Sequence, residues 1–274
     1  MTGWLAPEPT GWEPLLAQAL TEDIGTGDLT AGCFDHQPVS FYIEAQAEGV
    51  VSGIGIATAL FGNQLEVCSD DGEPVQAGSK LLKGCFDTRF VLAHERTALN
   101  FLMHLSGVAT LTNEFVKAVQ GTRARIIDTR KTLPGLRALQ KYAVRCGGGT
   151  NHRMGLYDAA MIKDNHIRAC GSITLAVSRL RESISHMAKI EVECENLEQV
   201  AEAAGLGVDV VMLDNMSIEL MRRAVTEFPT VVFEASGGVN LKTVAGIAQT
   251  GVHYISVGAL THSAPALPIH LEFD

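Results

Sequence analysis

Positively charged side chains gather in one part of a chain that is acidic overall. The 274 residues carry a formal net charge of -10, with 21 Lys and Arg against 31 Asp and Glu. Residues 123–168 nevertheless contain two histidines, only three acids and these ten cations: Arg123, Arg125, Arg130, Lys131, Arg137, Lys141, Arg145, Arg153, Lys163 and Arg168. Guanidinium and ammonium groups form charge-assisted hydrogen bonds with carboxylates and phosphates. The cluster therefore predicts a site for a small, densely charged anion.

The bulk composition narrows the class of protein. With 46% hydrophobic and 19% charged residues, the chain is typical of a soluble globular protein. A pI near 5.4 argues against nucleic acid as the main partner. Residues 1–20 lack a signal-peptide pattern, and the longest nearly apolar stretch, 50–62, is too short to span a membrane. The six cysteines form no CxxC pair, so we expect reduced thiols and a cytoplasmic location.

After about residue 120, short apolar runs alternate with amphipathic segments. The apolar runs predict strands at 124–131, 159–165, 189–196, 208–215, 230–238 and 253–260. Helical spacing predicts helices at 173–184, 197–204, 218–227 and 241–248. Asn196, Ser217 and Asn240 are candidate N-caps for three of these helices. Strands and helices that alternate in this way are typical of a parallel sheet.

The spacing of the runs favours an α/β barrel over an open doubly wound sheet. No GxGxxG motif follows the first run, which removes the main support for a dinucleotide-binding fold. A complete eight-unit barrel takes about 250 residues, more than the stretch 121–274 provides. We therefore predict an incomplete barrel behind a separate N-terminal α+β domain. Before residue 120 we expect helices at 12–22 and 92–105, the latter ending at Ser106-Gly107, and a further helix at 110–120.

Several candidate site residues are cations near the ends of the predicted strands. Active sites of α/β barrels lie at the carboxyl ends of the strands. Arg130, Lys131 and Lys163 fall at such ends, and His152 and Arg153 lie on a Gly-rich segment. Five such groups would repel one another in an empty pocket, so we predict that a multiply charged anion neutralises them. The alternative, a set of separate surface salt bridges, is least favoured for Lys131 and Lys163.

Two acids end neighbouring strands. Glu193 and Asp214 could hold Mg²⁺ beside a phosphate, act as acid/base groups, or simply balance the lysines. Strand alternation places Glu191 and Glu195 on the same face as Glu193. Glu193 is therefore chosen for its position near the strand end.

Small residues follow the last two predicted strands, in the segments EASGG (234–238) and VGA (257–259). Glycine lets backbone N–H groups approach a phosphate closely, and barrels commonly bind phosphate in their last two loops. The alternative is that these glycines only form turns. Together, the three groups of residues describe a site for a phosphorylated sugar, a divalent metal and a second anionic substrate.

Long motifs relate this chain to a known family. They are EDIGTGDLT (22–30), HERTALNFLMHLSGVAT (94–110), DTRKTLPGLRALQKYAVRCGGGTNHRMGLYD (128–158), IKDNHI (162–167), VECEN (192–196), VMLDN (211–215), EASGG (234–238) and ISVGALTHSAPALPI (255–269). In these motifs the chain resembles the quinolinate phosphoribosyltransferases, or carboxylating nicotinate-nucleotide pyrophosphorylases. It departs from the family pattern at Leu133, where a second Thr is expected, and at Cys194, where an aliphatic residue is expected.

The resemblance implies an architecture. It predicts an N-terminal α+β sandwich in residues 1–108 and an incomplete, about seven-stranded α/β barrel in residues 109–261. It also implies that residues 262–274 pack back onto the first domain, and that the protein is a homodimer or a larger homo-oligomer.

The resemblance also implies a reaction. Quinolinate and phosphoribosyl pyrophosphate would give nicotinate mononucleotide, pyrophosphate and CO₂, with Mg²⁺ and without an organic cofactor. The residues implied as catalytic are Lys131, Lys163, Glu193 and Asp214. The quinolinate site would comprise Arg130, His152, Arg153, Lys163 and, from the neighbouring subunit, Arg96. Lys131, Glu193 and Asp214 would serve the ribose, the pyrophosphate and the metal. The remaining substrate-binding residues, most of them for the 5′-phosphate, would be Thr129, Ser236, Gly237, Gly238, Val257, Gly258 and Ala259.

Three alternatives stay open at this point. A paralogue found with molybdate-transport systems would keep the phosphate and metal groups and act on another ring acid. A Schiff-base aldolase would use a strand-end lysine such as Lys131 or Lys163. An anion-binding regulatory protein fits less well, because Glu193 and Asp214 would weaken anion binding if no metal were present.

Overall fold

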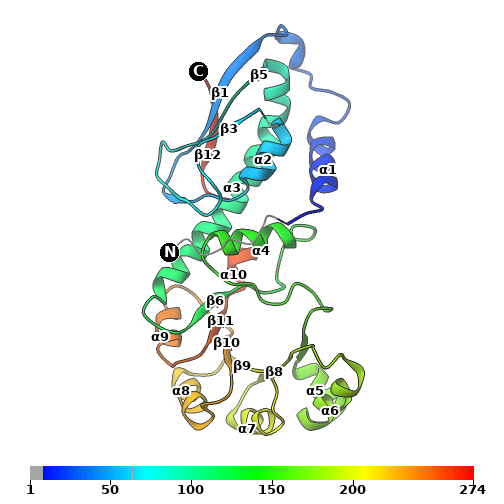
Figure 1. The fold of residues 1–274 in the computed structure, drawn as a ribbon, viewed down its shortest axis with the longest axis vertical. Coiled ribbons are helices and arrows are strands. Elements are labelled where there is room, and N and C mark those ends of the chain that lie inside the picture. The colour runs from blue at the N-terminus through cyan, green and yellow to red at the C-terminus, as the bar shows by residue number, and fades with distance from the viewer. Residues whose placement is uncertain (1–8, 63) are drawn as a thin grey trace. The chain divides into compact units, whose positions relative to one another are not determined.

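The computed structural model describes residues 9–62 and 64–274, and its contacts divide the chain into two compact units. Unit 1 comprises the described residues up to Asn113, with Thr132–Gly148 and Leu260–Asp274; unit 2 comprises Glu114–Lys131 and Gly149–Ala259. Both units can be followed in Figure 1. Residues 1–8 and Asn63, which belong to the predicted first domain, lie outside the described residues.

Unit 1 contains a four-stranded antiparallel sheet of order β12-β1-β5-β3. These strands are β1 (Pro38–Ala45), β3 (Glu66–Val67), β5 (Lys80–Asp87) and β12 (Ile269–Phe273). A separate two-stranded sheet joins β2 (Gly49–Val50) to β4 (Pro74–Val75). Strand alternation in β1 buries Phe41, Ile43 and Ala45 completely. The end of the chain therefore completes the sheet that its first third begins.

Aromatic side chains join this sheet to two helices, α2 (Ile54–Phe61) and α3 (Thr88–Ala118). The Phe41 ring lies 5.2 Å from the Phe61 ring and 6.2 Å from the Phe86 ring, centroid to centroid. Phe90 continues the row at 5.8 Å from Phe86. These spacings suit tilted aromatic contacts, which stabilise a core beyond simple burial. Helix α1 (Glu13–Ile24) corresponds to the helix predicted at 12–22.

The predicted helix end at Ser106-Gly107 is wrong, because α3 runs unbroken through both residues. Gly107 has another role there. A Cβ on Gly107 would lie 2.1 Å from the carbonyl oxygen of Pro265. The Leu267 N–H also donates to the Met103 carbonyl of the same helix at 2.9 Å. The glycine thus lets residues 265–267 pass against α3, and its cost within a helix, about 1 kcal/mol, is small in a helix of this length.

Unit 2 contains a six-stranded parallel sheet of order β6-β11-β10-β9-β8-β7. The strands are β6 (Arg125–Ile127), β7 (Ala160–Ile162), β8 (Ile190–Cys194), β9 (Val210–Asp214), β10 (Phe233–Ser236) and β11 (Tyr254–Ser256). All six predicted strands are confirmed. A parallel bridge from Ile127 to Thr150 adds one more backbone segment beside β6, without a further named strand among the described residues. The α/β class with an N-terminal α+β unit is confirmed.

Helices lie outside this sheet (Figure 1). They are α5 (Asp164–Cys170), α6 (Ile173–Ser183), α7 (Leu197–Gly205), α8 (Ile218–Glu227) and α9 (Val244–Ala248). The side chains of Asn196 and Ser217 cap α7 and α8 as predicted. Asn240 does not cap α9, because it forms a turn ahead of that helix and Thr243 stands at the N-cap. Helices α4 (Arg137–Cys146) and α10 (Ala259–His262) complete the chain.

All six cysteines are free. Among the residues described, none of the helices combines the length and the apolar character needed to cross a membrane.

The close approach at Gly107 can be tested with a matched pair of variants. Gly107→Ala should lower the free energy of unfolding by about 1–3 kcal/mol, since the new methyl group meets backbone that has no room to move. Gly205→Ala, in a helix with open space at the Cβ position, should instead raise it by about 0.4–1 kcal/mol. Urea denaturation of both variants measures these changes. Equal effects would show that Gly107 has no packing role.

Candidate active site

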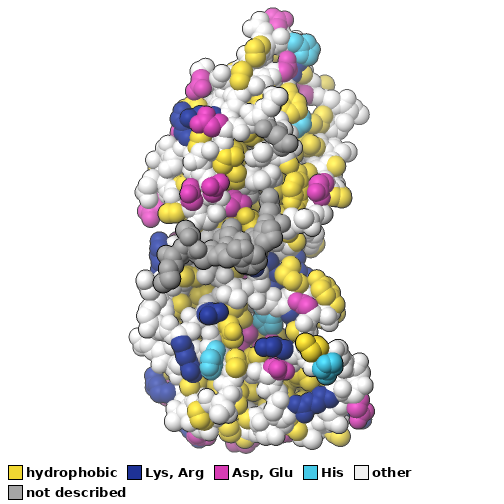
Figure 2. All heavy atoms as spheres, viewed as in Figure 1, with side chains coloured by type: hydrophobic (Ala, Val, Ile, Leu, Met, Phe, Trp, Pro, Cys, Tyr) yellow, Lys and Arg dark blue, Asp and Glu magenta, His cyan; other side chains and the backbone are white. Residues whose placement is uncertain are grey.

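A cavity opens at the carboxyl ends of the unit 2 strands. The described residues that line it are Thr129, Arg130, Lys131, His152, Arg153, Met161, Lys163, Met212, Glu234, Ser236 and Ser256. Seven of these are predicted site residues, and they come from four separate segments of the sequence. Several Lys, Arg and His side chains appear together on the face of unit 2 seen in Figure 2. The parallel sheet thus gathers cations that are far apart along the chain.

A buried aspartate fixes the Gly-rich segment that carries His152 and Arg153. Asp128 follows β6 and is fully buried, and its carboxylate accepts hydrogen bonds from Asn151 Nδ2 at 2.6 Å and His152 N at 2.9 Å. The Thr150 N–H donates to the Ile126 carbonyl, which aligns this segment with β6. A buried carboxylate that accepts backbone and amide donors holds its partners firmly, because leaving them unpaired is costly.

Arg153 is held beside the cavity by its own contacts. Its Nη1 donates to the Ala159 carbonyl at 3.0 Å. Asp158 accepts hydrogen bonds from the backbone N–H groups of Met154 and Gly155, which closes the intervening turn. Burial, together with the nearby charge of Arg130, lowers the pKa of Arg153. An anionic ligand would relieve the part of this lowering that comes from repulsion by Arg130.

Lys163 and Glu193 form a direct ion pair. Lys163 Nζ lies 2.7 Å from Glu193 Oε2, and Lys163 is also the N-cap of α5. Asp214, at the end of the neighbouring strand β9, accepts a hydrogen bond from Asn215 Nδ2 at 2.7 Å. Glu193 and Asp214 are not among the described residues that line the cavity. Glu193 is the penultimate residue of β8 and Asp214 the last residue of β9, and these two strands pair with each other.

The small residues after β10 and β11 adopt the conformations that glycine allows. Gly237 has φ +89°, and a Cβ there would lie 2.1 Å from Asn215 Oδ1. Gly238 has φ +61° with open space around it. Val257 is buried, and its N–H is already donated to the Ile127 carbonyl at 3.0 Å. The half-buried Gly258 and Ala259 come directly after it.

Arg96 lies on α3 in unit 1, where its side chain is exposed. Arg96 is not among the described residues that line the cavity. Its predicted role as a residue given to another subunit's site therefore stays a prediction.

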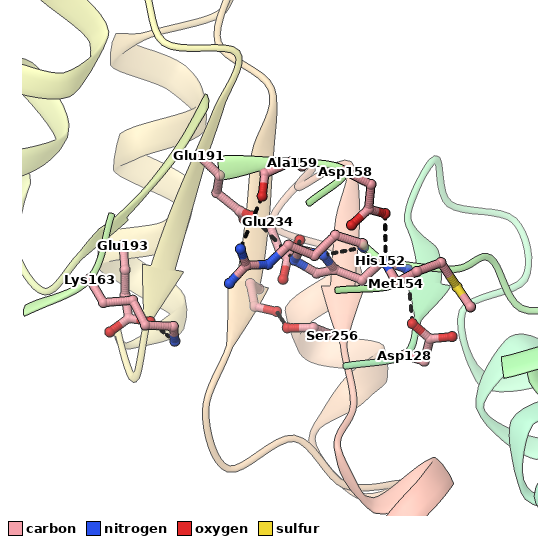
Figure 3. A network of polar contacts seen from close by, with 12 residues as sticks. Asp128, His152, Met154, Asp158, Ala159, Lys163, Glu191, Glu193, Glu234 and Ser256 are labelled. Carbon is pink, nitrogen blue, oxygen red and sulfur yellow. Dashed lines mark hydrogen bonds and ion pairs between the residues drawn. The ribbon is translucent and has the colours of Figure 1, made fainter. Parts of the chain in front are cut away.

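Sequence reasoning missed a buried cluster beneath the cations. His152 Nε2 lies 3.2 Å from Glu191 Oε2 and 3.6 Å from Glu234 Oε2 (Figure 3). Glu191 and Glu234 are only 7% and 3% exposed. Strand alternation had placed Glu191 on the same face as Glu193, and Glu234 opens the EASGG motif, so the signal was present. What was missing was the pairing order that brings β8 and β10 within reach of residue 152.

The ligand atoms of these three residues lie within 4.8 Å of one another, close enough for a metal ion. The hydrogen bonding of His152 argues for a different role. Its Nδ1 accepts the Arg153 N–H at 2.6 Å, so the neutral ring has its proton on Nε2, the nitrogen that faces the two carboxyl groups. A metal-binding histidine does the reverse, since it binds through the unprotonated nitrogen.

Glu234 is the acid most affected by this environment. Burial, with the charge of Glu191 beside it, raises the pKa of Glu234 well above its ordinary value of 4.5. One oxygen of each glutamate, Oε1, has no hydrogen-bond partner among the described residues. These surroundings favour the protonated form of the Glu234 carboxyl group under a cation-rich cavity.

The fold and the site together define a class: an α/β enzyme with cations and glycine loops at the carboxyl ends of a parallel sheet. The chain belongs to the quinolinate phosphoribosyltransferase family. Residues 28–106 match the N-terminal domain of quinolinate phosphoribosyl transferase, and residues 108–272 match the C-terminal domain.

Individual relatives agree with this assignment. The chain is 44% identical over 236 residues to the carboxylating nicotinate-nucleotide pyrophosphorylase of Mycobacterium leprae. The aligned region covers 82% of each protein. It is similar in structure to the nicotinate-nucleotide pyrophosphorylase of Ehrlichia chaffeensis, with a TM-score of 0.93 and 41% identity over 96% of this chain and 99% of the other. The Francisella tularensis enzyme matches with a TM-score of 0.93 and 36% identity over 100% of both chains. The paralogue and aldolase alternatives gain no support from these relatives.

The buried carboxyl group predicts a pH-dependent stability. The pKa of Glu234 is higher in the folded protein than in the unfolded chain. Its contribution to the free energy of unfolding is therefore fully present below the unfolded-state pKa, and it is lost as pH rises through the folded-state pKa. The free energy of unfolding of the wild type should therefore fall as pH is raised above 4.5, and that of Glu234→Gln should fall less. Urea denaturation at a series of pH values measures both. The exposed control Glu195→Gln should follow the wild type, and an unchanged slope in Glu234→Gln would contradict a buried proton.

Proposed function

We propose that this chain transfers the phosphoribosyl group of phosphoribosyl pyrophosphate to quinolinate and releases CO₂, which forms nicotinate mononucleotide and pyrophosphate for NAD biosynthesis. The observation that carries the proposal is the convergence of Arg130, Lys131, His152, Arg153 and Lys163 on one cavity. The family and the names of the relatives point to the same reaction.

The cation-rich wall suits quinolinate, which carries two adjacent carboxylates. Arg130, Arg153 and Lys163 supply guanidinium and ammonium donors around the cavity. Each charge-assisted hydrogen bond to a carboxylate contributes about 1.5–3 kcal/mol. His152, whose Nδ1 accepts the Arg153 N–H and whose Nε2 lies 3.2 Å from Glu191, would form the floor on which the pyridine ring lies.

Lys131, Glu193 and Asp214 would attend the ribose and the pyrophosphate. Loss of pyrophosphate leaves positive character on the ribose C1, which a nearby carboxylate stabilises electrostatically. Glu193 uses one oxygen for Lys163 and Asp214 one oxygen for Asn215, so each keeps an oxygen for a ligand. Such hard oxygen donors on neighbouring strands fit Mg²⁺, which would neutralise the charge of the pyrophosphate.

The loops after β10 and β11 would hold the 5′-phosphate. Ser236 offers a hydroxyl group, and the main-chain N–H groups of Gly237, Gly238, Gly258 and Ala259 are candidate donors. The Val257 N–H is already donated to the Ile127 carbonyl, so Val257 would anchor this loop to β6 and would not itself bind the phosphate. Thr129, whose hydroxyl accepts the Lys131 N–H at 3.0 Å, would set the approach of Lys131.

Decarboxylation then needs no organic cofactor. Once the ring nitrogen is alkylated, the pyridinium withdraws electrons from C2, and the C2 carboxylate leaves as CO₂. The enzyme chiefly positions two anions that would otherwise repel each other.

Assembly, location and domain division complete the proposal. A homodimer or larger homo-oligomer would place Arg96 in the site of the neighbouring subunit. The free cysteines suit a cytoplasmic location. The chain would divide into residues 1–108, with 262–274 joining them, and a barrel domain of residues 109–261.

The reaction is tested by release of labelled CO₂ from carboxyl-labelled quinolinate. Purified protein should release it only when phosphoribosyl pyrophosphate and Mg²⁺ are both present, and EDTA should abolish release. Lys163→Ala should lower kcat/KM at least about 100-fold, because it removes a cavity cation and frees Glu193 to repel the substrate. No release from folded wild-type protein would overturn the proposal.

Sharing of sites between subunits is tested by mixing two inactive variants. In a hybrid of Arg96→Ala and Lys163→Ala, one site carries both substitutions and the other carries neither. An equal mixture that exchanges subunits as a dimer should recover roughly a quarter of wild-type activity.

The matched control mixes Lys163→Ala with Lys131→Ala, which belong to the same subunit's site, and should recover nothing. Recovery in the control, or none in the first mixture despite proven subunit exchange, would contradict a shared site.

A further inference from the structure

The proposed reaction requires a proton donor, and none of the roles assigned so far provides one. When the C2–carboxylate bond breaks, its electron pair stays on C2 in the plane of the ring. The product carries hydrogen at C2, so a proton must arrive along the direction that the carboxylate has just left. The donor must therefore line the same cavity as the groups that bind this carboxylate.

Most polar groups of that cavity are poor proton donors. Arginine does not give up a proton at physiological pH. The Lys163 ammonium group is already paired with Glu193 at 2.7 Å. Glu234 is different, because it is the acidic residue among the described residues that line the cavity.

The surroundings of Glu234 hold it in place. It lies on β10, is 3% exposed, and has the hydroxyl-bearing Ser256 beside it on β11. Figure 3 shows it grouped with His152 and Glu191, at a distance from the Lys163–Glu193 pair. His152 Nε2 lies 3.2 Å from Glu191 Oε2 and 3.6 Å from Glu234 Oε2, and the Arg153 N–H holds the other ring nitrogen. Glu234 is therefore enclosed by His152, Glu191 and Ser256 on its buried side.

We propose that Glu234 is the acid that protonates C2 of the pyridine ring when CO₂ leaves, with His152 and Glu191 as its positioning residues. This inference rests on the proposed function. In the step, the C2–carboxylate bond breaks and releases CO₂, and the electron pair left on C2 takes the proton of the Glu234 carboxyl group. Glu234 becomes a carboxylate and regains a proton from water after the product leaves. Overall, one CO₂ is lost and one proton is taken up.

Electrostatics support a protonated carboxyl group at this position. Burial raises the pKa of Glu234, and so does the carboxylate of Glu191. The titratable or charged groups that face it, within the part of the chain described, are Glu191 on β8, His152 on the Gly-rich segment and Lys163 after β7. Lys163 acts in the opposite direction and is the weakest of these influences.

The test separates the two chemical steps in a single turnover. Pyrophosphate release reports phosphoribosyl transfer, and formation of nicotinate mononucleotide reports protonation of C2. Glu234→Gln keeps the shape of the side chain and removes its transferable proton. It should slow nicotinate mononucleotide formation by about 100-fold or more, the usual contribution of a general acid.

The same variant should keep the rate of pyrophosphate release within about threefold, since it spares the cationic groups that bind substrate. Labelled pyrophosphate should then exchange into phosphoribosyl pyrophosphate when quinolinate is present, because the unprotonated intermediate reverts. The exposed control Glu195→Gln should leave both steps at wild-type rates.

The outcomes are distinct. Wild-type nicotinate mononucleotide formation by folded Glu234→Gln, or equal slowing of both steps, would overturn the inference. Absence of pyrophosphate release by the wild type would instead overturn the proposed function.

A second measurement uses only the wild type and does not depend on a variant that folds. The single-turnover rate of nicotinate mononucleotide formation should fall as pH rises, because deprotonated Glu234 has no proton to give, while pyrophosphate release should not follow the same fall. Two steps with identical pH profiles would contradict the role of Glu234.

Discussion

The structure of unit 2 depends on balancing positive charge that would not stay together unaided. Arg130, Lys131, Arg153 and Lys163 share one cavity in a protein that is acidic overall. Carboxylates beneath and beside the cations supply the balance in the resting protein, as the Lys163–Glu193 pair shows. When an anionic substrate binds, its charges would replace the protein carboxylates as partners of these cations. This exchange explains why acids and cations alternate through the site.

The parallel sheet makes this balance geometrically possible. Because all six strands run the same way, their carboxyl ends meet at one edge, and residues from distant segments converge there. The buried Asp128 extends the arrangement by holding the Gly-rich segment against β6. Below this edge, one layer deeper in the sheet, Glu191 and Glu234 contact His152. The site therefore has a cationic rim and an acidic floor, and the two layers suit different chemical steps.

Much of this organisation is visible in the sequence because it follows local rules. Short apolar runs predict the six strands, and amphipathic runs of period 3.6 predict four of the helices. The ends of the predicted strands then predict the cations of the cavity. The continuous helix α3 was not predictable, because the role of Gly107 depends on Pro265, which lies far along the chain. The His152–Glu191–Glu234 cluster likewise depends on strand order, which no local pattern encodes. Asn240 resembled a cap but forms a turn, since the capping residues Asn and Ser serve both structures equally well.

In the proposed reaction, the two adjacent carboxylates of quinolinate would neutralise the cations of the cavity. The most direct test is calorimetric titration of the wild-type protein with quinolinate and with nicotinate, which lacks the C2 carboxylate. The second carboxylate should add about 1.5–3 kcal/mol, so quinolinate should bind roughly 10- to 150-fold more tightly. Raised salt should reduce the difference. Equal affinities for the two acids would show that the cavity does not recognise the dianion, and would contradict this account of the site.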